Sequence, residues 1–90
     1  MAEYEIGQIV ISRQGKDKGL IYVVSCVEAN GYIAIIRPDK YNVRHPKRKN
    51  PKHLQSTLKS AENLLDYIKA GKDIDRGYFI RSVGIYGKFR

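Results

Sequence analysis

Apolar residues occur in short bursts over the first two thirds of this chain. The bursts cover residues 9–11, 20–27, 32–36 and 41–43, and a fifth begins at Leu54. Turn residues separate them, and each burst is rich in β-branched or aromatic side chains, which is typical of strands. The pattern therefore predicts five short strands joined by tight turns.

Two of these turns can be predicted from their own residues. Asn30 and Gly31 lie between the second and third bursts, and this dipeptide tolerates the positive φ values of a two-residue hairpin turn. Residues 37–40, Arg-Pro-Asp-Lys, predict another turn, because proline presets the first central dihedral of a type I turn. Five such strands favour a small barrel, since closure removes edges that so short a sheet could not otherwise protect.

The period of the apolar residues changes from Ser60 onward. Intervals of three and four residues place four of them on one face of a helix: Ala61, Leu64, Leu65 and Ile68. We expect one helix over residues 60–70, with Ser60 as its N-cap and Gly71 as a left-handed C-cap.

A second short helix is predicted near the end of the chain. Its cap and its apolar positions would be Asp75, Phe79, Val83 and Tyr86. Three glycines weaken it: Gly77, Gly84 and Gly87. The whole chain is expected to be mostly β, with a barrel over residues 1–58 and a helical extension of the same domain over residues 59–90.

The length and composition are typical of one small folded domain. The chain has 90 residues, of which 42% are hydrophobic and 29% charged. Cys26 is the single cysteine, so an intramolecular disulfide is excluded and a zinc site would lack its usual thiolates; we expect it to be a small core residue. The longest apolar run, residues 20–24, is far short of a membrane span of about 20 residues, and the N-terminus is acidic, unlike a signal peptide. These features favour a cytoplasmic protein with no membrane partner.

Charge is concentrated in one segment. Residues 37–59 hold eight basic side chains and one acid, Asp39, which is +7 of the net charge of +8. Such a patch on a nearly neutral surface is the electrostatic footprint of a nucleic-acid binder, although an acidic protein or membrane would also be attracted. Pro38, Pro46 and Pro51 disfavour helix at the preceding residues, so we expect the charges to lie on a loop.

A second polar segment, residues 13–19, joins the first two strands. Gly15 and Gly19 would let its backbone turn sharply and approach a ligand closely. Asp17 is expected to neutralise its basic neighbours in part, and a plain polar hairpin loop explains the segment equally well. It is not a Walker loop, because no Gly-Lys-Ser or Gly-Lys-Thr closes it.

With both segments considered together, the chain resembles the KOW-domain RNA-binding proteins. The matching segments are residues 7–19, the Tyr-Val-Val at 22–24, and the Pro-Lys-Arg-Lys-Asn-Pro-Lys-His-Leu at 46–54, and the resemblance covers about residues 6–57. It is closest to small bacterial relatives of the fourteen-e type of large-subunit ribosomal protein. Where those relatives carry an Ala-Asp-Gly-Lys type of turn, this chain has Arg-Pro-Asp-Lys at 37–40.

This resemblance implies an SH3-like, five-stranded barrel that contacts ribosomal RNA through its loops. It extends RNA contact to Lys16, Lys18, Lys47, Arg48, Lys49, Lys52 and His53. Two basic neighbours complete the predicted site: Arg13 and Arg44. Four residues are expected to shape turns: Gly15, Gly19, Asn30 and Gly31. His53 and three further side chains could stack on or hydrogen-bond to bases: Tyr41, Asn42 and His45.

The predicted function is therefore non-enzymatic RNA binding, associated with the ribosome and translation, with no cofactor, metal or small-molecule substrate. One alternative is a transcription-linked nucleic-acid binder. Another is a protein-interaction module whose groove would be lined by Tyr4, Tyr22, Tyr32 and Tyr41. An enzyme is disfavoured, because the histidines, the cysteine and the scattered carboxylates provide no nucleophile with its base.

Overall fold

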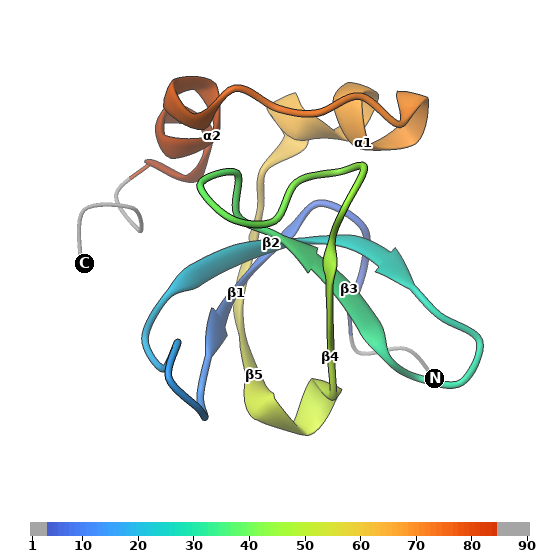
Figure 1. Ribbon diagram of the computed structural model, residues 1–90, viewed down its shortest axis with the longest axis vertical. Helices are drawn as coiled ribbons and strands as arrows, with labels where there is room; N and C mark the ends of the chain where they lie inside the picture. The colour runs from blue at the N-terminus through green and yellow to red at the C-terminus, as the bar shows by residue number, and fades with distance from the viewer. Residues whose placement is uncertain (1–3, 85–90) are drawn as a thin grey trace.

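The computed structural model describes residues 4–84, which form a five-stranded antiparallel sheet with two short helices (Figure 1). The strands are β1 (Gln8–Ser12), β2 (Ile21–Val27), β3 (Ile33–Ile36), β4 (Lys47–Lys49) and β5 (Leu54–Ser60). The helices are α1 (Leu65–Ala70) and α2 (Arg76–Val83), and two 3₁₀-helices, η1 (Pro51–His53) and η2 (Glu62–Leu64), flank β5. The predicted mostly-β fold with C-terminal helices is confirmed.

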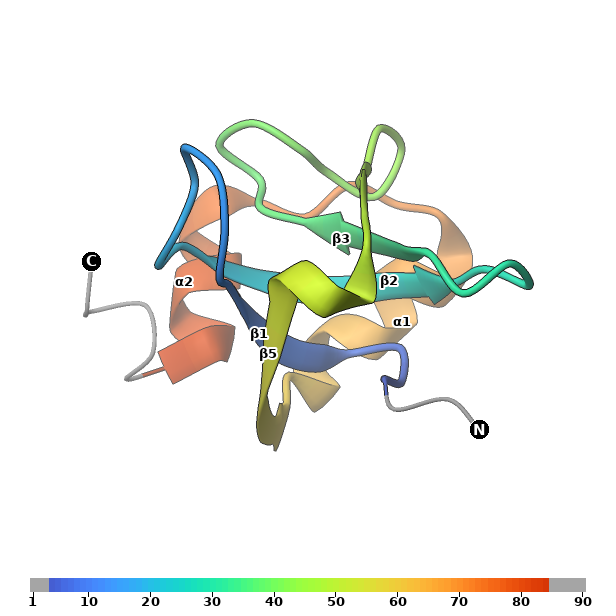
Figure 2. The same ribbon diagram turned by 90° about the horizontal axis from the view of Figure 1, so that it is seen from below.

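The sheet is curled but not closed. Its order is β4-β3-β2-β1-β5, so β4 and β5 are opposite edges, and no pairing joins them. In a flat sheet these edges would lie about 19 Å apart. The five steps from Lys49 to Leu54 span at most about 17 Å when extended, and less here because η1 rises only about 2 Å per residue. The sheet must therefore bend to bring its edges together at η1, and Figure 2 shows the chain crossing there.

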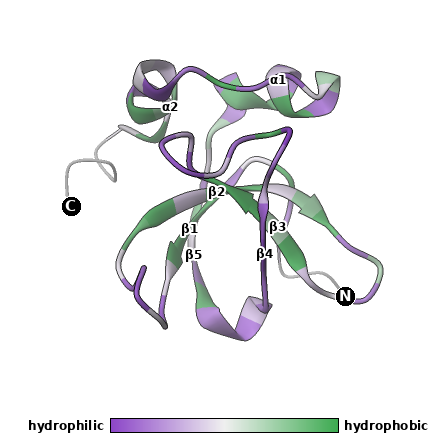
Figure 3. Ribbon diagram, viewed as in Figure 1, coloured by the Kyte–Doolittle hydropathy of each residue, from purple (hydrophilic) through white to green (hydrophobic). Residues whose placement is uncertain are grey.

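The fourth strand lies six residues later in the chain than predicted. Residues 41–43 make only isolated bridges, whereas β4 occupies the middle of the basic run that was expected to be a loop. Its register pairs Lys49 with Ile33 and Lys47 with Ile35. Lysine is disfavoured inside sheets but common on edge strands, where charge blocks further pairing. Figure 3 shows β4 as a hydrophilic strand beside the hydrophobic β3.

The predicted hairpin between β2 and β3 is present, but its turn is not a two-residue one. The N–H of Gly31 donates to the carbonyl of Glu28 at 2.9 Å, and the N–H of Glu28 donates to the carbonyl of Tyr32 at 2.8 Å. Gly31 has φ +94°, whereas Asn30 keeps a negative φ. This is a three-residue turn closed by a glycine bulge. At the next connection, the N–H of Lys40 donates to the carbonyl of Arg37 at 2.9 Å, so the predicted turn at 37–40 is confirmed.

Both predicted helices form, but the first begins later in the chain than expected. Ser60 is the last residue of β5 and caps nothing; η2 comes between it and α1, while Gly71 ends α1 at φ +71° as expected. Asp75 caps α2 by accepting a hydrogen bond from the N–H of Tyr78. Two of the predicted apolar positions of this helix are buried, Phe79 and Val83, and the other, Tyr86, lies outside the described residues together with Gly87.

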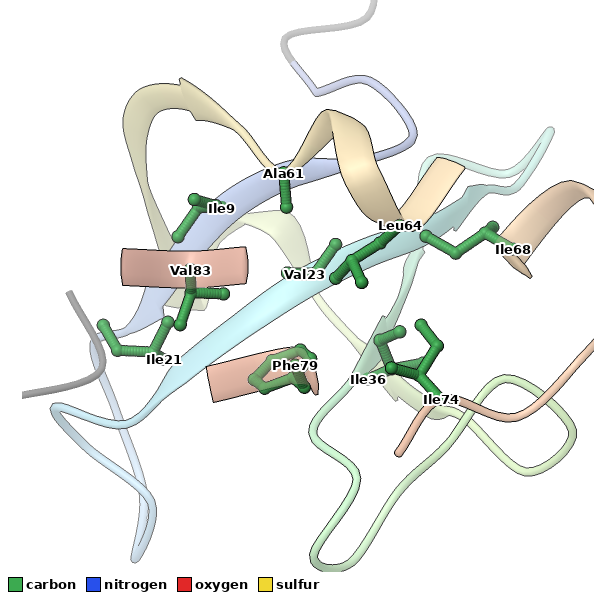
Figure 4. Close-up of a cluster of buried hydrophobic side chains, with 10 residues drawn as sticks. All are labelled: Ile9, Ile21, Val23, Ile36, Ala61, Leu64, Ile68, Ile74, Phe79 and Val83. Atoms are coloured by element: carbon green, nitrogen blue, oxygen red, sulfur yellow. The ribbon is translucent and has the colours of Figure 1, made fainter. Parts of the chain in front are cut away.

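Two apolar clusters lie on opposite faces of the sheet. Between the sheet and the helices, ten buried residues pack together (Figure 4): Ile9, Ile21, Val23, Ile36, Ala61, Leu64, Ile68, Ile74, Phe79 and Val83. Inside the curl, seven more form a second cluster: Tyr4, Val10, Tyr22, Val24, Ile33, Ile35 and Leu54. Successive residues of β2 point to opposite faces, and both faces are covered. This explains why residues 20–24 are apolar without alternation.

Cys26 is not a core residue. It lies on β2 but is exposed, beyond a register shift between Val24 and Cys26 in the pairing with β3. Beyond the shift, Val27 and not Cys26 pairs with Ile33 and packs on the cluster inside the curl, so the prediction of a buried thiol is wrong. No helix within residues 4–84 has the length and apolar character needed to cross a membrane.

The side chain of Asn42 fastens the helical layer to the rest of the fold. Its amide donates to the carbonyl of Ile74 at 2.9 Å and accepts from the N–H of the same residue at 2.8 Å. The N–H of Arg44 donates to the carboxylate of Asp73 at 2.8 Å. The connection between α1 and α2 is thus held to residues 42–44, and the Asn42 amide is used inside the fold, not displayed for base contact as the sequence suggested.

Candidate nucleic-acid interface

The structure brings two segments of the predicted RNA site together at one end of the sheet. The N–H of Arg13 donates to the carbonyl of His53 at 2.7 Å, which holds the β1–β2 loop against η1. The ammonium of Lys49 donates to the carbonyl of Gln14 at 3.3 Å. In Figure 1 the loop and η1 lie at the end of the sheet away from the helices. Lys52, in η1, is therefore a neighbour of the loop.

Two other predicted residues lie elsewhere. Arg44 is beside Asp73 at the α1–α2 connection, on the helical side of the sheet. Arg48 points toward the β2–β3 hairpin, where its guanidinium lies 3.0 Å from the carboxylate of Glu28 and 4.7 Å from the ring centre of Tyr32. The continuous basic segment of the sequence is thus divided among three places in the fold.

Asp17 organises the end of the sheet where the loop meets β4. One carboxylate oxygen accepts from the Ser12 hydroxyl at 2.8 Å and lies 3.1 Å from the Lys49 ammonium. The other accepts from the Tyr22 hydroxyl at 2.8 Å and from the Lys47 ammonium at 3.2 Å. Asp17 was expected to neutralise its sequence neighbours in the loop. It instead pairs with two lysines about 30 residues away, because the loop folds back over β4.

This environment shifts the pKa of the Asp17 carboxyl and of the Tyr22 phenol in opposite directions. Burial alone would raise the pKa of Asp17, but hydrogen bonds from Tyr22, Ser12, Lys49 and Lys47 outweigh it and hold that pKa well below its ordinary value. Burial, followed by the hydrogen bond to the Asp17 carboxylate, raises the pKa of Tyr22 above its ordinary value. The carboxylate is therefore ionised, and the phenol protonated, across the physiological pH range.

The central lysines of the predicted site thus have a structural role. The side chain of Lys49 is only 10% exposed and that of Lys47 is 28% exposed, against 12% for Asp17. A phosphate reaching Lys49 would have to displace a buried ion pair. This could not be predicted from the sequence, because the two acids that pair with the segment, Asp17 and Glu28, lie outside it and approach it only in the fold.

Four predicted cations remain unpaired at this end of the molecule: Arg13, Lys16, Lys18 and Lys52. All four are exposed, and none forms an ion pair with another described residue. Gly15 and Gly19, at φ +89° and +90°, turn the loop so that Asp17 points inward while its basic neighbours face solvent. We call the surface formed by these four side chains the basic corner.

The groove that a protein-interaction module would need is not formed by the four tyrosines named for it. Tyr22 is 2% exposed and Tyr4 is 7% exposed, and both pack into the cluster inside the curl. Tyr4 also donates its hydroxyl to the carbonyl of Leu54 at 3.0 Å. Tyr32 remains exposed and Tyr41 is half-buried, in contact with Lys40 and Lys47.

Within residues 4–84 no three histidine, cysteine or carboxylate side chains gather where they could hold a metal ion. Comparisons of the sequence with models of protein families and with curated proteins found no match. The resemblance to KOW-domain proteins therefore stays a prediction, and the function has to be argued from the surface itself.

Proposed function

We propose that this protein is an RNA-binding module without catalytic activity, and that it contacts RNA through the basic corner. One observation carries the proposal: Asp17, the only acid of the β1–β2 loop, forms largely buried ion pairs with Lys47 and Lys49 of β4. The loop therefore presents cations with no acid to neutralise them. Exposed cations within about 10 Å of one another act on a polyanion as a group at moderate salt.

The shape of the fold supports the same proposal. A five-stranded, strongly curled antiparallel sheet is compatible with the SH3-like barrel that the KOW resemblance implies, although this sheet is open. That resemblance also favours ribosomal RNA of the large subunit as the target and the cytoplasm as the location. Lysine and arginine at the corner would neutralise phosphates, which positions a protein on RNA without selecting a sequence.

A salt titration tests the binding step. Affinity for a fluorescent single-stranded RNA, measured by anisotropy, is expected to fall with a log–log salt slope of about −3 if four phosphates are neutralised, at −0.7 for each phosphate on a single strand. Replacing Lys16 and Lys18 with Ala should reduce the slope by about 1.4 in magnitude. A slope near zero would remove the electrostatic interface.

The matched control is a double variant with the same net charge, Lys69→Ala with Lys72→Ala. Both residues are exposed at the end of α1, on the far side of the sheet from the basic corner. This control should bind RNA like the unmodified protein. Equal losses in the two double variants would mean that net charge, and not the basic corner, governs binding.

The target needs a separate measurement. Ultraviolet crosslinking in the source cells, followed by sequencing of the attached nucleic acid, should give crosslinks concentrated on ribosomal RNA and attached to peptides around Lys16 and Lys52. Crosslinks spread over many transcripts would replace the ribosomal role with general RNA binding. Crosslinks to DNA would favour the transcription-linked alternative.

A further inference from the structure

A pocket of about 140 Å³ lies between α2 and the turn at residues 37–40. Its floor is apolar and consists of Ile21, Phe79 and Val83, which Figure 4 shows side by side where β2 begins. Charged residues from both elements stand around it, among them Arg37 and Arg76. None of the four side chains of the basic corner lines this pocket.

The volume fits one small planar ring. An apolar protein cavity of about 150 Å³ binds benzene, and a pyrimidine base is a six-membered ring of similar size with polar substituents on its edge. A purine would have to leave part of its double ring outside. The floor residues are themselves at most 3% exposed, so a base unstacked from its neighbours would pack against Ile80, which lines the pocket and is 44% exposed.

The charged residues match the edge of such a base. The Arg37 guanidinium donates one N–H to the carbonyl of Ile21 at 2.9 Å, and four of its five N–H groups are left for its partner Asp39 and for a ligand. Asp39, whose side chain is 42% exposed, can accept from a ring N–H or an exocyclic amine. Arg76 is exposed and has no ion pair with another described residue, so it is available for the phosphate.

The position of the pocket links it to the basic corner. Ile21 follows Lys18 by three residues, which is at most about 10 Å of extended chain. A single strand whose phosphates lie on the β1–β2 loop is therefore within reach of the pocket. One nucleotide of that strand can turn its base inward while its neighbours stay on the corner.

We infer that this pocket holds one unstacked pyrimidine nucleotide of a bound RNA, with the base against Ile80 and the phosphate at Arg76. The inference rests on the proposed function and adds a base-binding site to it. It also provides the contact with a base edge that phosphate neutralisation alone lacks.

The test is a titration of the full chain with mononucleotides, followed by ¹H–¹⁵N NMR. CMP and UMP should produce saturable shifts at residues of α2 and of the turn at 37–40, while ribose 5-phosphate, which lacks a base, should not. Arg76→Ala should raise the dissociation constant about two- to fivefold, the weight of one exposed charge pair. Ile80→Ala, which removes apolar contact from the pocket lining, should also weaken binding.

Arg81→Ala is the matched control on the same helix, because Arg81 lies over the ring of Tyr78 and does not line the pocket. It should bind CMP and UMP like the unmodified protein. Shifts that are equal for ribose 5-phosphate, or tighter binding of AMP than of CMP and UMP, would overturn the inference. So would an affinity left unchanged by both Arg76→Ala and Ile80→Ala in variants with an unchanged thermal midpoint.

The two proposals can fail separately. If single-stranded RNA binds through Lys16 and Lys18 but no nucleotide shifts the pocket, the RNA-binding function stands and the base site is lost. If CMP and UMP bind at the pocket while RNA shows no salt-dependent affinity, the pocket stands and the basic corner is lost.

Discussion

The carboxylate of Asp17 connects the β1–β2 loop to the start of β2 and to β4, which lies about 30 residues away. It lies in the β1–β2 loop, accepts from Tyr22 of β2 and pairs with Lys47 and Lys49 of β4. Its four partners satisfy both oxygens, which is what a carboxylate needs when most of its surface is removed from water. The same contacts explain why an edge strand of three basic residues keeps its place beside β3.

Replacing Asp17 with Asn should therefore destabilise the fold. The amide has one oxygen, so it can accept from only one of the Ser12 and Tyr22 hydroxyls, which donate to different oxygens of Asp17. The largely buried ammonium of Lys49 also loses its counter-charge. Breaking a buried ion pair in this way costs about 3 kcal/mol or more. The free energy of unfolding in urea at pH 7 measures the loss.

Glu28→Gln is the control for this variant. It removes the partner of Arg48, whose side chain is 56% exposed, and an exposed pair contributes less than about 1 kcal/mol. If both variants lose the same amount, the Asp17 pairs behave like surface pairs and the fold does not depend on them.

The lowered pKa of Asp17 predicts where its contribution depends on pH. The folded state favours the ionised carboxyl, so the stabilisation is complete above the unfolded pKa of about 3.9 and is lost as pH falls toward the lower folded value. The difference in unfolding free energy between the unmodified protein and Asp17→Asn should be constant from pH 7 to pH 5 and should shrink below about pH 4. Urea unfolding across this range checks it. A difference that already shrinks near pH 6 would contradict the assignment to Asp17.

At the scale of the elements, Gly7 shows how closely the start of β1 packs on the helical layer. It has φ +91°, and a β-carbon placed there would lie 2.7 Å from a methyl group of Leu65. Gly19 has φ +90° with no atom within 4 Å of the same position. The two glycines thus share their backbone conformation and differ in available space.

Alanine at each position separates backbone strain from steric overlap. Gly19→Ala should cost about 1–2 kcal/mol, the penalty of a left-handed non-glycine residue. Gly7→Ala should cost about 1 kcal/mol more, because it also overpacks against Leu65. Thermal and urea unfolding measure both. Leu65→Ala combined with Gly7→Ala should remove the additional cost, and a double variant with no such coupling would contradict the assigned contact.

Part of the element structure could be predicted from local patterns, and β4 shows where that stops. Residues 20–27 and 32–36 have strand propensity of their own, and Gly71 and Asp75 carry the chemistry of helix ends, so these elements were found. Lys47–Lys49 has little strand propensity and forms β4 through its pairing with β3 and its contacts with Asp17. Those contacts join residues that are 30 and 32 positions apart. Patterns of residue spacing within one helix or strand cannot predict contacts over such a separation.

The candidate site could also be predicted only as far as it depends on local sequence. Lys16, Lys18 and Lys52 could be named as exposed cations from charge alone, and the structure leaves them exposed. Their separation from Arg44 and Arg48 could not be predicted, because it depends on the turn at 37–40 and on the path of β4. The pocket was also beyond prediction, since Arg37 and Arg76 meet there only because α2 packs against the start of β2.

At the scale of the whole molecule, the sheet needs the helices to be complete. Four of its side chains face the helical layer and are at most 3% exposed: Ile9, Ile21, Val23 and Ile36. A barrel with one interior would bury only the cluster inside the curl. Here the cluster between the sheet and the helices takes its other half from η2, α1, α2 and the segment that Asn42 fastens. The helical extension is therefore part of the core.

A fragment of residues 1–60 is therefore expected not to fold. Exposing the four sheet residues would cost about 6–12 kcal/mol, at about 1.5–3 for each large apolar side chain, against a total stability of about 5–15 kcal/mol for a small domain. The fragment should show no cooperative thermal transition and no dispersed NMR spectrum. Adding a synthetic peptide of residues 61–90 should restore both, since it returns the missing half of the cluster. A fragment that melts cooperatively near the temperature of the full chain would instead make the helices a separable addition to a self-sufficient sheet.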